Sequence, residues 1–213
     1  WKFNWLIAFK VKMKKIGITG SIASGKTTAS KILSQRKGPL FSADNIVKKL
    51  YSKKSFQKLL TKKFHIHKDQ GFKSQIKKKI LTNAKNVEKL EKLIHPLVRS
   101  EMKKFSLFNR DKKLLFFEIP LLIESKLMSY FDIIIFIKAK KDIRLKRFKS
   151  KGGQTKLFNV LNKKQIPDLK KTKFCDYIVV NEKNLNILKK KLLDIIKLYE
   201  WSFSRYRNYW SLI

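Results

Sequence analysis

Residues 14–36 read KKIGITGSIASGKTTASKILSQR, and this stretch carries the strongest structural signal in the chain. Within it, GSIASGKT (residues 20–27) fits the pattern G-x-x-x-x-G-K-[ST] of a phosphate-binding loop. Before the loop, β-branched residues predict a short buried strand: Ile16, Ile18 and Thr19. After it, apolar positions share one face of a predicted helix: Ala29, Ile32 and Leu33. Because strand, loop and helix follow in the order that a phosphate cradle needs, we expect the chain to bind a nucleoside triphosphate.

The loop is expected to hold the phosphates together with a magnesium ion. Its two glycines allow positive φ, so that backbone N–H groups and the N-terminus of the next helix can converge on phosphate oxygens. Lys26 supplies positive charge for the β- and γ-phosphates, and Thr27 supplies a hydroxyl for Mg²⁺. The residues predicted to contact the nucleotide are Gly20, Ser21, Ile22, Ala23, Ser24, Gly25, Lys26, Thr27 and Thr28.

Length and composition limit the class of protein. A chain of 213 residues with 43% hydrophobic content suits one α/β domain with an insertion, or two small domains. No apolar run approaches the ~20 residues that a bilayer-crossing helix needs, so no membrane span is predicted. The one cysteine, Cys175, excludes an internal disulfide and favours a reducing, cytoplasmic location. We expect Cys175 to be a small, partly buried apolar side chain.

The net charge of +37 raises nucleic acid or an anionic membrane as a possible partner. The excess lysines are spread along the whole chain, and Lys, Asn, Ile and Phe are abundant together, which favours compositional drift towards A/T-rich codons. We therefore expect weak, nonspecific binding of polyanions and no specific nucleic-acid partner.

The pattern of the chain predicts an α/β fold of the P-loop NTPase type, with three layers around a parallel sheet. Further strands are expected at 40–41, 114–117, 133–139 and 176–181, and a closing amphipathic helix follows the last of them. The nucleotide-binding core is assigned to residues 13–45, 105–145 and 173–200. The helical acceptor-binding insertion is assigned to 46–104, and the lid to 146–172.

The two ends of the sequence are assigned separately. Residues 1–12, WKFNWLIAFKVK, precede Met13, where a natural start is expected, which makes them an N-terminal extension. An anchor at a membrane surface is the alternative for this aromatic segment. Residues 201–213 form an aromatic, basic C-terminal tail without clear periodicity, which could pack on the domain, contact a surface or be disordered.

Two acidic residues follow predicted strands. Asp44 comes after the strand at 40–41, and Glu118 ends the strand at 114–117. In open α/β sheets, ligands bind at the carboxyl ends of the strands. We expect Asp44 to accept the proton of an acceptor hydroxyl, and Glu118 to hold a metal-bound water. The alternatives are capping of the next helix for either residue, or a structural role for Glu118.

Residues 52–104 are lysine-rich and predicted to be helical. The apolar spacing of residues 72–105 predicts two amphipathic helices, the second of which Pro96 breaks or restarts. His65 and His67 are expected to be surface residues and not metal ligands. His95, before Pro96, is a slightly better candidate for a functional residue, but a place in a structural turn is the simpler interpretation.

The segment 146–172 is polar and suits a lid over the nucleotide. Arg147 lies on the helix that leads into it and is expected to close on the phosphates, because a planar guanidinium suits bidentate binding. A core with a phosphate loop, a helical insertion and an arginine-bearing lid together describe a small-molecule kinase.

At this point the sequence resembles the dephospho-coenzyme A kinase family. The resemblance covers roughly 13–198 and is carried by stretches in the family's order: IGITGSIASGKTT, FSADNIVKKLY, LEKLIHPLVR, FEIPLLIES and FDIIIFI, with RLKR before the lid and Gln165-Ile166-Pro167 within it. It implies transfer of the γ-phosphate of ATP to the ribose 3′-hydroxyl of dephospho-coenzyme A, with Mg²⁺. It also implies that Asp44 lies at that hydroxyl, that Arg147 is the lid arginine and that 46–104 holds the acceptor.

Three positions depart from the family pattern. Ser21 and Ala23 stand where the family loop has glycines, and we expect the change to be tolerated. Ser42 replaces the first acid of a D-A-D triplet that ends in Asp44, and Gln75 stands where an arginine is frequent.

The alternatives are another P-loop kinase acting on a nucleoside, nucleotide or shikimate-like acceptor, and an ATP-switched nucleic-acid-binding protein. A monomer or small homo-oligomer is expected.

Overall fold

A computed structural model of the chain describes residues 13–66, 71–82 and 84–208. The predictions for 1–12, for His67 and for the end of the C-terminal tail therefore lie outside the described residues. The chain divides into two compact units, which are described separately: residues 1–40 with 109–213, and residues 41–108.

The first unit is organised on a β-sheet. Its strands are β1 (Lys14–Gly20), β3 (Leu114–Glu118), β4 (Ile133–Lys138) and β5 (Tyr177–Val180). With β2 (Leu40–Ser42) they form one sheet in the order β2-β3-β1-β4-β5. β1 pairs in parallel with both β3 and β4, and β4 pairs in parallel with β5. The predicted parallel sheet is confirmed, with the strand of the phosphate loop at its centre.

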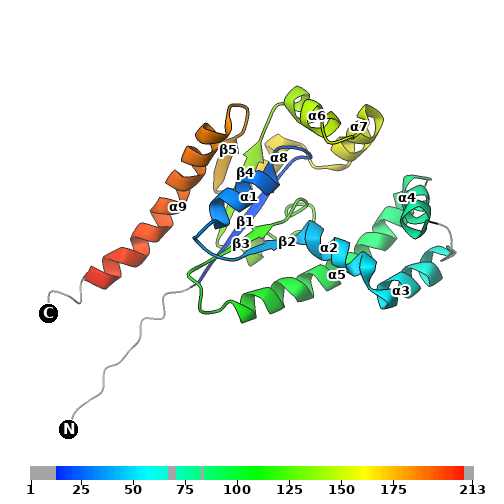
Figure 1. Cartoon of the computed structure of the whole chain (residues 1–213), viewed down its shortest axis with the longest axis horizontal. Helices are drawn as coiled ribbons and strands as arrows, with labels where there is room; N and C mark the ends of the chain where they lie inside the picture. The colour runs from blue at the N-terminus through cyan, green and yellow to red at the C-terminus, as the bar shows by residue number, and fades with distance from the viewer. Residues whose placement is uncertain (1–12, 67–70, 83, 209–213) are drawn as a thin grey trace, which may run out of the picture. The chain divides into compact units, whose positions relative to one another are not determined.

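One face of this sheet is covered by α1 (Lys26–Ser34) and α9 (Leu185–Asn208), which pack beside each other (Figure 1). Alternate residues of each strand point towards these helices, as the two-residue period of a strand requires. The residues of this core are Ile16, Ile18, Ala29, Leu33, Leu114, Phe116, Ile133, Ile135, Ile137, Val179, Leu188, Leu192 and Ile196. The predicted closing helix is therefore confirmed, and it continues to Asn208, through the first part of the tail.

The remaining helices of this unit follow β4. These α-helices are α6 (Lys141–Lys149), α7 (Thr155–Lys164) and α8 (Asp168–Thr172). A short 3₁₀ turn, η1 (Met128–Tyr130), lies before β4. Phe158 of α7 is fully buried and contacts the ring of Phe148 with centroids 5.6 Å apart. This aromatic pair attaches α7 to α6.

The second unit is helical, as predicted, with α2 (Ala43–Ser52), α3 (Lys54–Phe64), α4 (Phe72–Thr82) and α5 (Ala84–Phe108). Among its described residues, the buried apolar side chains are Phe41, Ala43, Leu50, Phe56, Leu60, Phe64, Ile66, Ile76, Leu90, Val98 and Met102. They recur at helical spacing, so each helix contributes one apolar face to the core of this unit.

The prediction for Pro96 is wrong, because α5 continues through this residue from Ala84 to Phe108. Proline removes one backbone hydrogen bond and crowds the preceding turn. The buried side chains of Leu90, Val98 and Met102 lie on both sides of it and stabilise the long helix by packing. His95 consequently lies inside α5 and not in the predicted turn.

Within the described part of the chain, no helix is long and apolar enough to cross a membrane.

Candidate active site

The phosphate loop connects β1 to α1 and has the predicted backbone. Gly20 has φ 152° and Gly25 has φ 96°, in the region that side chains rarely adopt. A Cβ at Gly25 would overlap the side-chain amide of Asn181, and one at Gly20 would overlap the carbonyl oxygen of Ile137. Both glycines are therefore required by backbone conformation and by close neighbours. α1 then begins directly at Lys26, so its first N–H groups border the loop.

Ala23 also has a left-handed backbone, with φ 57°. An L-residue pays about 1–2 kcal/mol for this conformation because its Cβ approaches the carbonyl oxygen. The loop thus keeps the curved backbone that a glycine would adopt freely, with strain localised at Ala23.

The Lys26 side chain folds back over the loop. Its Nζ donates a hydrogen bond of 2.9 Å to the carbonyl oxygen of Ser21, and the residue is mostly buried. This contact places the ammonium charge at the Ser21 end of the loop.

Thr27 and Glu118 bring two oxygen donors together. The Thr27 hydroxyl donates to Glu118 Oε1 at 2.5 Å, and Glu118 is buried at the end of β3. Hard oxygen donors of this kind suit Mg²⁺, which binds one or two protein oxygens and completes its shell with phosphate and water. Capping by Glu118 is excluded, because the residues directly after it begin no helix and the next helical turn starts at Met128. Among the described residues, no group of three or more His, Cys, Asp or Glu forms a metal-binding cluster.

The other end of the loop is held through the carbonyl oxygen of Ser24. Arg147 Nη1 donates to it at 3.4 Å, and Asn181 Nδ2 donates to it at 2.8 Å. Arg147, predicted from the sequence, therefore contacts the loop. Asn181, at the end of β5, was not predicted, because only the parallel order of the strands brings it beside Gly25.

Arg144, three residues before Arg147 on α6, is a second arginine at the loop. It is buried, and its guanidinium donates to the carbonyl oxygens of Ala139 and Ile22 at 3.1 and 3.4 Å and to Asn162 Oδ1 at 2.7 Å. Burial lowers the pKa of Arg144, while the charge of Asp168 opposes that shift. The spacing of Arg144 and Arg147 on one helix turns both towards the loop.

Residues 165–171, which run from the end of α7 into α8, also contact the loop directly. The backbone N–H of Ile22 donates to Gln165 Oε1 at 2.9 Å, and the Ser21 hydroxyl donates to Asp168 Oδ1. Gln165 was noted only as part of the family pattern, and Asp168 was missed, since no local pattern marks it.

Glu124 and Lys171 attach these residues to the turn that follows β3. Lys171 Nζ lies 2.5 Å from Glu124 Oε1, and Lys171 is fully buried. Glu124 Oε1 also accepts a hydrogen bond of 3.2 Å from the backbone N–H of Ile166. Removing water from an ion pair strengthens its attraction but costs desolvation, so each partner depends on the other.

Asp44 belongs to the second unit. It is exposed and lies in the first turn of α2, whose N-cap is Ser42. The prediction that Asp44 caps this helix is therefore wrong. The positive end of the helix dipole nevertheless stabilises a carboxylate in the first turn.

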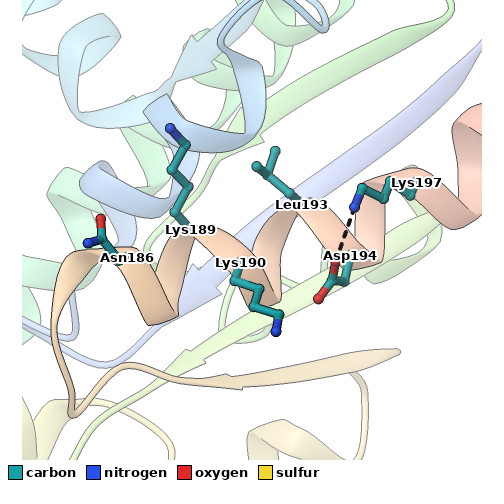
Figure 2. Close-up of a pocket in the computed structure, with 6 residues that line it drawn as sticks. All are labelled: Asn186, Lys189, Lys190, Leu193, Asp194 and Lys197. Atoms are coloured by element: carbon teal, nitrogen blue, oxygen red, sulfur yellow. Dashed lines mark hydrogen bonds and ion pairs between the residues drawn. The ribbon is translucent and has the colours of Figure 1, made fainter.

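Two hollows of the first unit lie outside the loop. One is a surface hollow on α9, lined by side chains of that helix alone, as Figure 2 shows: Asn186, Lys189, Lys190, Leu193, Asp194 and Lys197. The other is lined by Met13, Lys15, Ser129, Tyr130, Phe131 and Asp132. Neither contains a residue of the loop.

Comparison with known proteins identifies relatives along most of the chain. A family model described as dephospho-CoA kinase matches residues 14–186. A dephospho-CoA kinase of Bartonella quintana is 36% identical over 190 residues, which cover 87% of this chain and 97% of that protein.

Solved structures extend the comparison to the fold. A dephospho-CoA kinase from Campylobacter jejuni matches with a TM-score of 0.62 at 23% identity, covering 86% of this chain and 95% of the other. A shikimate kinase from Acinetobacter baumannii matches with a TM-score of 0.51 at 14% identity, covering 89% and 94%. The three-layer α/β fold of P-loop kinases, predicted from the sequence, is confirmed.

Proposed function

The chain belongs to the dephospho-CoA kinase family, and we propose how its own residues carry out the reaction of that family. The reaction transfers the γ-phosphate of ATP to the ribose 3′-hydroxyl of dephospho-CoA, which gives CoA and ADP in the last step of CoA biosynthesis. The observation that carries this function is the family match over residues 14–186, which contains the complete phosphate loop.

In the proposed mechanism, the loop holds the phosphates of ATP through its backbone N–H groups. Lys26 exchanges its contact with the Ser21 carbonyl for the β- and γ-phosphates, and its charge stabilises the transferring group. Arg147 adds a guanidinium from α6, and its contact with the Ser24 carbonyl supports this assignment.

A magnesium ion is the second part of the proposal. Thr27 and Glu118 would hold it, directly or through water, and their oxygen donors support the assignment. When bound, the ion would neutralise charge on the phosphates.

We assign the role of general base to Asp44. It is an exposed carboxylate that follows β2 by two residues, and the stretch FSADNIVKKLY around it carries the family pattern. Accepting the proton of the 3′-hydroxyl as the phosphate is transferred makes that oxygen a better nucleophile. The acceptor itself is assigned to the helices of residues 46–104.

The decisive experiment is an ADP-release assay with purified protein, ATP and Mg²⁺, in which dephospho-CoA is compared with adenosine, other nucleosides and shikimate. Turnover is expected with dephospho-CoA and not with the other acceptors. Turnover with one of those, and none with dephospho-CoA, would reassign the acceptor. Size-exclusion chromatography of the same sample will decide between a monomer and a small homo-oligomer.

We place the protein in the cytoplasm, because the reaction consumes ATP.

Asp44→Asn tests the base. We expect it to lower kcat by about 10²–10⁴-fold, because proton transfer in the transition state is lost. The Kd of ATP should stay unchanged, since the loop is intact. Asp111→Asn, an exposed acid in the turn after α5, is the matched control and should retain normal kcat. Normal turnover by Asp44→Asn would remove the residue from the mechanism.

A further inference from the structure

The phosphate loop has two ends with different neighbours. At the Ser24 end, Arg147 and Asn181 donate to a carbonyl oxygen. At the Ser21 end, the ammonium group of Lys26 donates to the Ser21 carbonyl. In the proposed mechanism this ammonium moves from the Ser21 carbonyl to the β- and γ-phosphates, so we expect the terminal phosphate beside the Ser21 end of the loop.

Two side chains of residues 165–171 contact this same end: Gln165, which follows α7, and Asp168, the first residue of α8. Gln165 Oε1 accepts the hydrogen bond of the Ile22 N–H at 2.9 Å, and Asp168 Oδ1 accepts from the buried Ser21 hydroxyl. A glycine at position 21 would have no hydroxyl to donate, so the second contact depends on the serine that this chain carries.

Glu124, in the turn after β3, holds these residues at two points. Glu124 Oε1 accepts from the Ile166 N–H and pairs with the buried Lys171. Asp168 therefore lies between two attachment points, Ile166 and Lys171, and its carboxylate is placed at Ser21 by the fold and not by chance.

A carboxylate at this end opposes a triphosphate in two ways. A phosphate oxygen that takes the Ile22 N–H must displace Gln165, because the N–H group donates one strong hydrogen bond at a time. The negative charges of Asp168 and of the γ-phosphate also repel each other in a partly buried site, where screening by water is weak. Arg144 offsets part of this repulsion, since it lies near enough to interact with Asp168.

We propose that Asp168 is a specificity-determining residue of the nucleotide site, which weakens the binding of a nucleoside triphosphate more than that of a diphosphate. The reason is that only the γ-phosphate has to share the Ser21 end of the loop with the carboxylate. The inference rests on the nucleotide-binding role of the loop proposed above, and it adds a residue that selects between the two forms of the nucleotide.

The test compares the Kd of ATP and of ADP, each with Mg²⁺, by isothermal titration calorimetry on the full chain. Asp168→Asn keeps the size of the side chain and removes its charge. We expect it to lower the Kd of ATP by about fivefold and to change that of ADP by less than about twofold. The control is Asp111→Asn, which removes the same charge at an exposed position and should leave both values unchanged.

A second pair of variants tests the contact itself. Ser21→Gly and Asp168→Ala each remove one partner of the hydrogen bond, so their effects on the ratio of the ATP and ADP dissociation constants should not add in the double variant. Asp168→Asn carries the test if Asp168→Ala does not fold.

Equal shifts for ATP and ADP, no shift, or weaker ATP binding in Asp168→Asn would each overturn the proposal. The titrations contain no acceptor. A failure of turnover with dephospho-CoA would therefore contradict the proposed function and leave the proposed role of Asp168 untouched. Equal effects on ATP and ADP binding would overturn the role of Asp168 and leave the proposed function untouched.

Discussion

Ala23 is a residue of the phosphate loop whose backbone conformation is strained for an L-amino acid. Its φ of 57° is a conformation that glycine adopts without strain. We predict that Ala23→Gly raises the free energy of unfolding by up to about 1 kcal/mol, because relief of strain exceeds the added entropy of the unfolded chain. Urea unfolding followed by circular dichroism measures the change.

Ala29→Gly is the control for this substitution. Ala29 is fully buried in α1, where glycine weakens the helix by about 1 kcal/mol and removes a packed methyl group. If both variants destabilise the protein equally, the backbone of residue 23 is not strained.

Cys175 offers a prediction about pH. Burial, mainly, and the charge of Asp176 raise the pKa of its thiol to about 11, and the thiol also donates to the Lys171 carbonyl oxygen at 3.3 Å. Only the thiolate reacts with iodoacetamide, and a raised pKa leaves less thiolate at neutral pH. In the folded protein, the alkylation rate should keep rising up to about pH 11.

The unfolded chain in urea supplies the reference for Cys175. Its alkylation rate should level off above the ordinary thiol pKa of about 8.5. Identical pH profiles in the folded and unfolded chain would show that the environment of Cys175 is not protective.

At the scale of the element, α8 is held in place by the buried ammonium group of Lys171, which pairs with Glu124. We predict that Lys171→Met lowers the free energy of unfolding by about 3 kcal/mol, because it leaves the carboxylate of Glu124 without its cation in a mostly dry site. Lys170→Met is the matched control, since this neighbouring lysine is exposed and should change stability by less than about 0.5 kcal/mol. Equal effects of the two substitutions on urea unfolding would refute a stabilising role of the pair.

The elements themselves were largely predictable from the sequence. Continuous apolar runs such as residues 114–117 mark central parallel strands, and the loop motif has a local spacing that fixes strand, turn and helix together. Pro96 was interpreted wrongly, because local propensity predicted a break where packing on both sides maintains the helix.

The contacts around the loop were only partly predictable. Lys26, Thr27 and Arg147 were predicted from motif and residue type. Asp168 lies 147 positions from Ser21 along the chain, and Asn181 lies 157 positions from Ser24. Such pairs are created by the order of the strands and by the course of α7 and α8, and no periodicity in the sequence signals them.

At the scale of the whole molecule, the net charge of +37 must be reconciled with a small-molecule reaction. Lysines spread over the surface attract any polyanion by releasing its counterions, and this attraction weakens steeply with salt. We predict that the protein binds single-stranded RNA of unrelated sequences equally well, and that the affinity falls by about 10³-fold between 50 and 200 mM salt. Fluorescence anisotropy with two labelled RNAs of different sequence measures both properties.

The kinase reaction gives this measurement its control. In the proposed mechanism, Lys26 and the N-terminus of α1 act on the phosphates at short range. Turnover with dephospho-CoA should therefore survive 200 mM salt far better than RNA binding does. RNA binding that persists at high salt, prefers one sequence and is unaffected by dephospho-CoA would instead favour a nucleic-acid-binding role. If RNA binding depends steeply on salt and shows no sequence preference, the positive charge acts only as a general property of the surface, and the specific ligand binding of the molecule is at the loop.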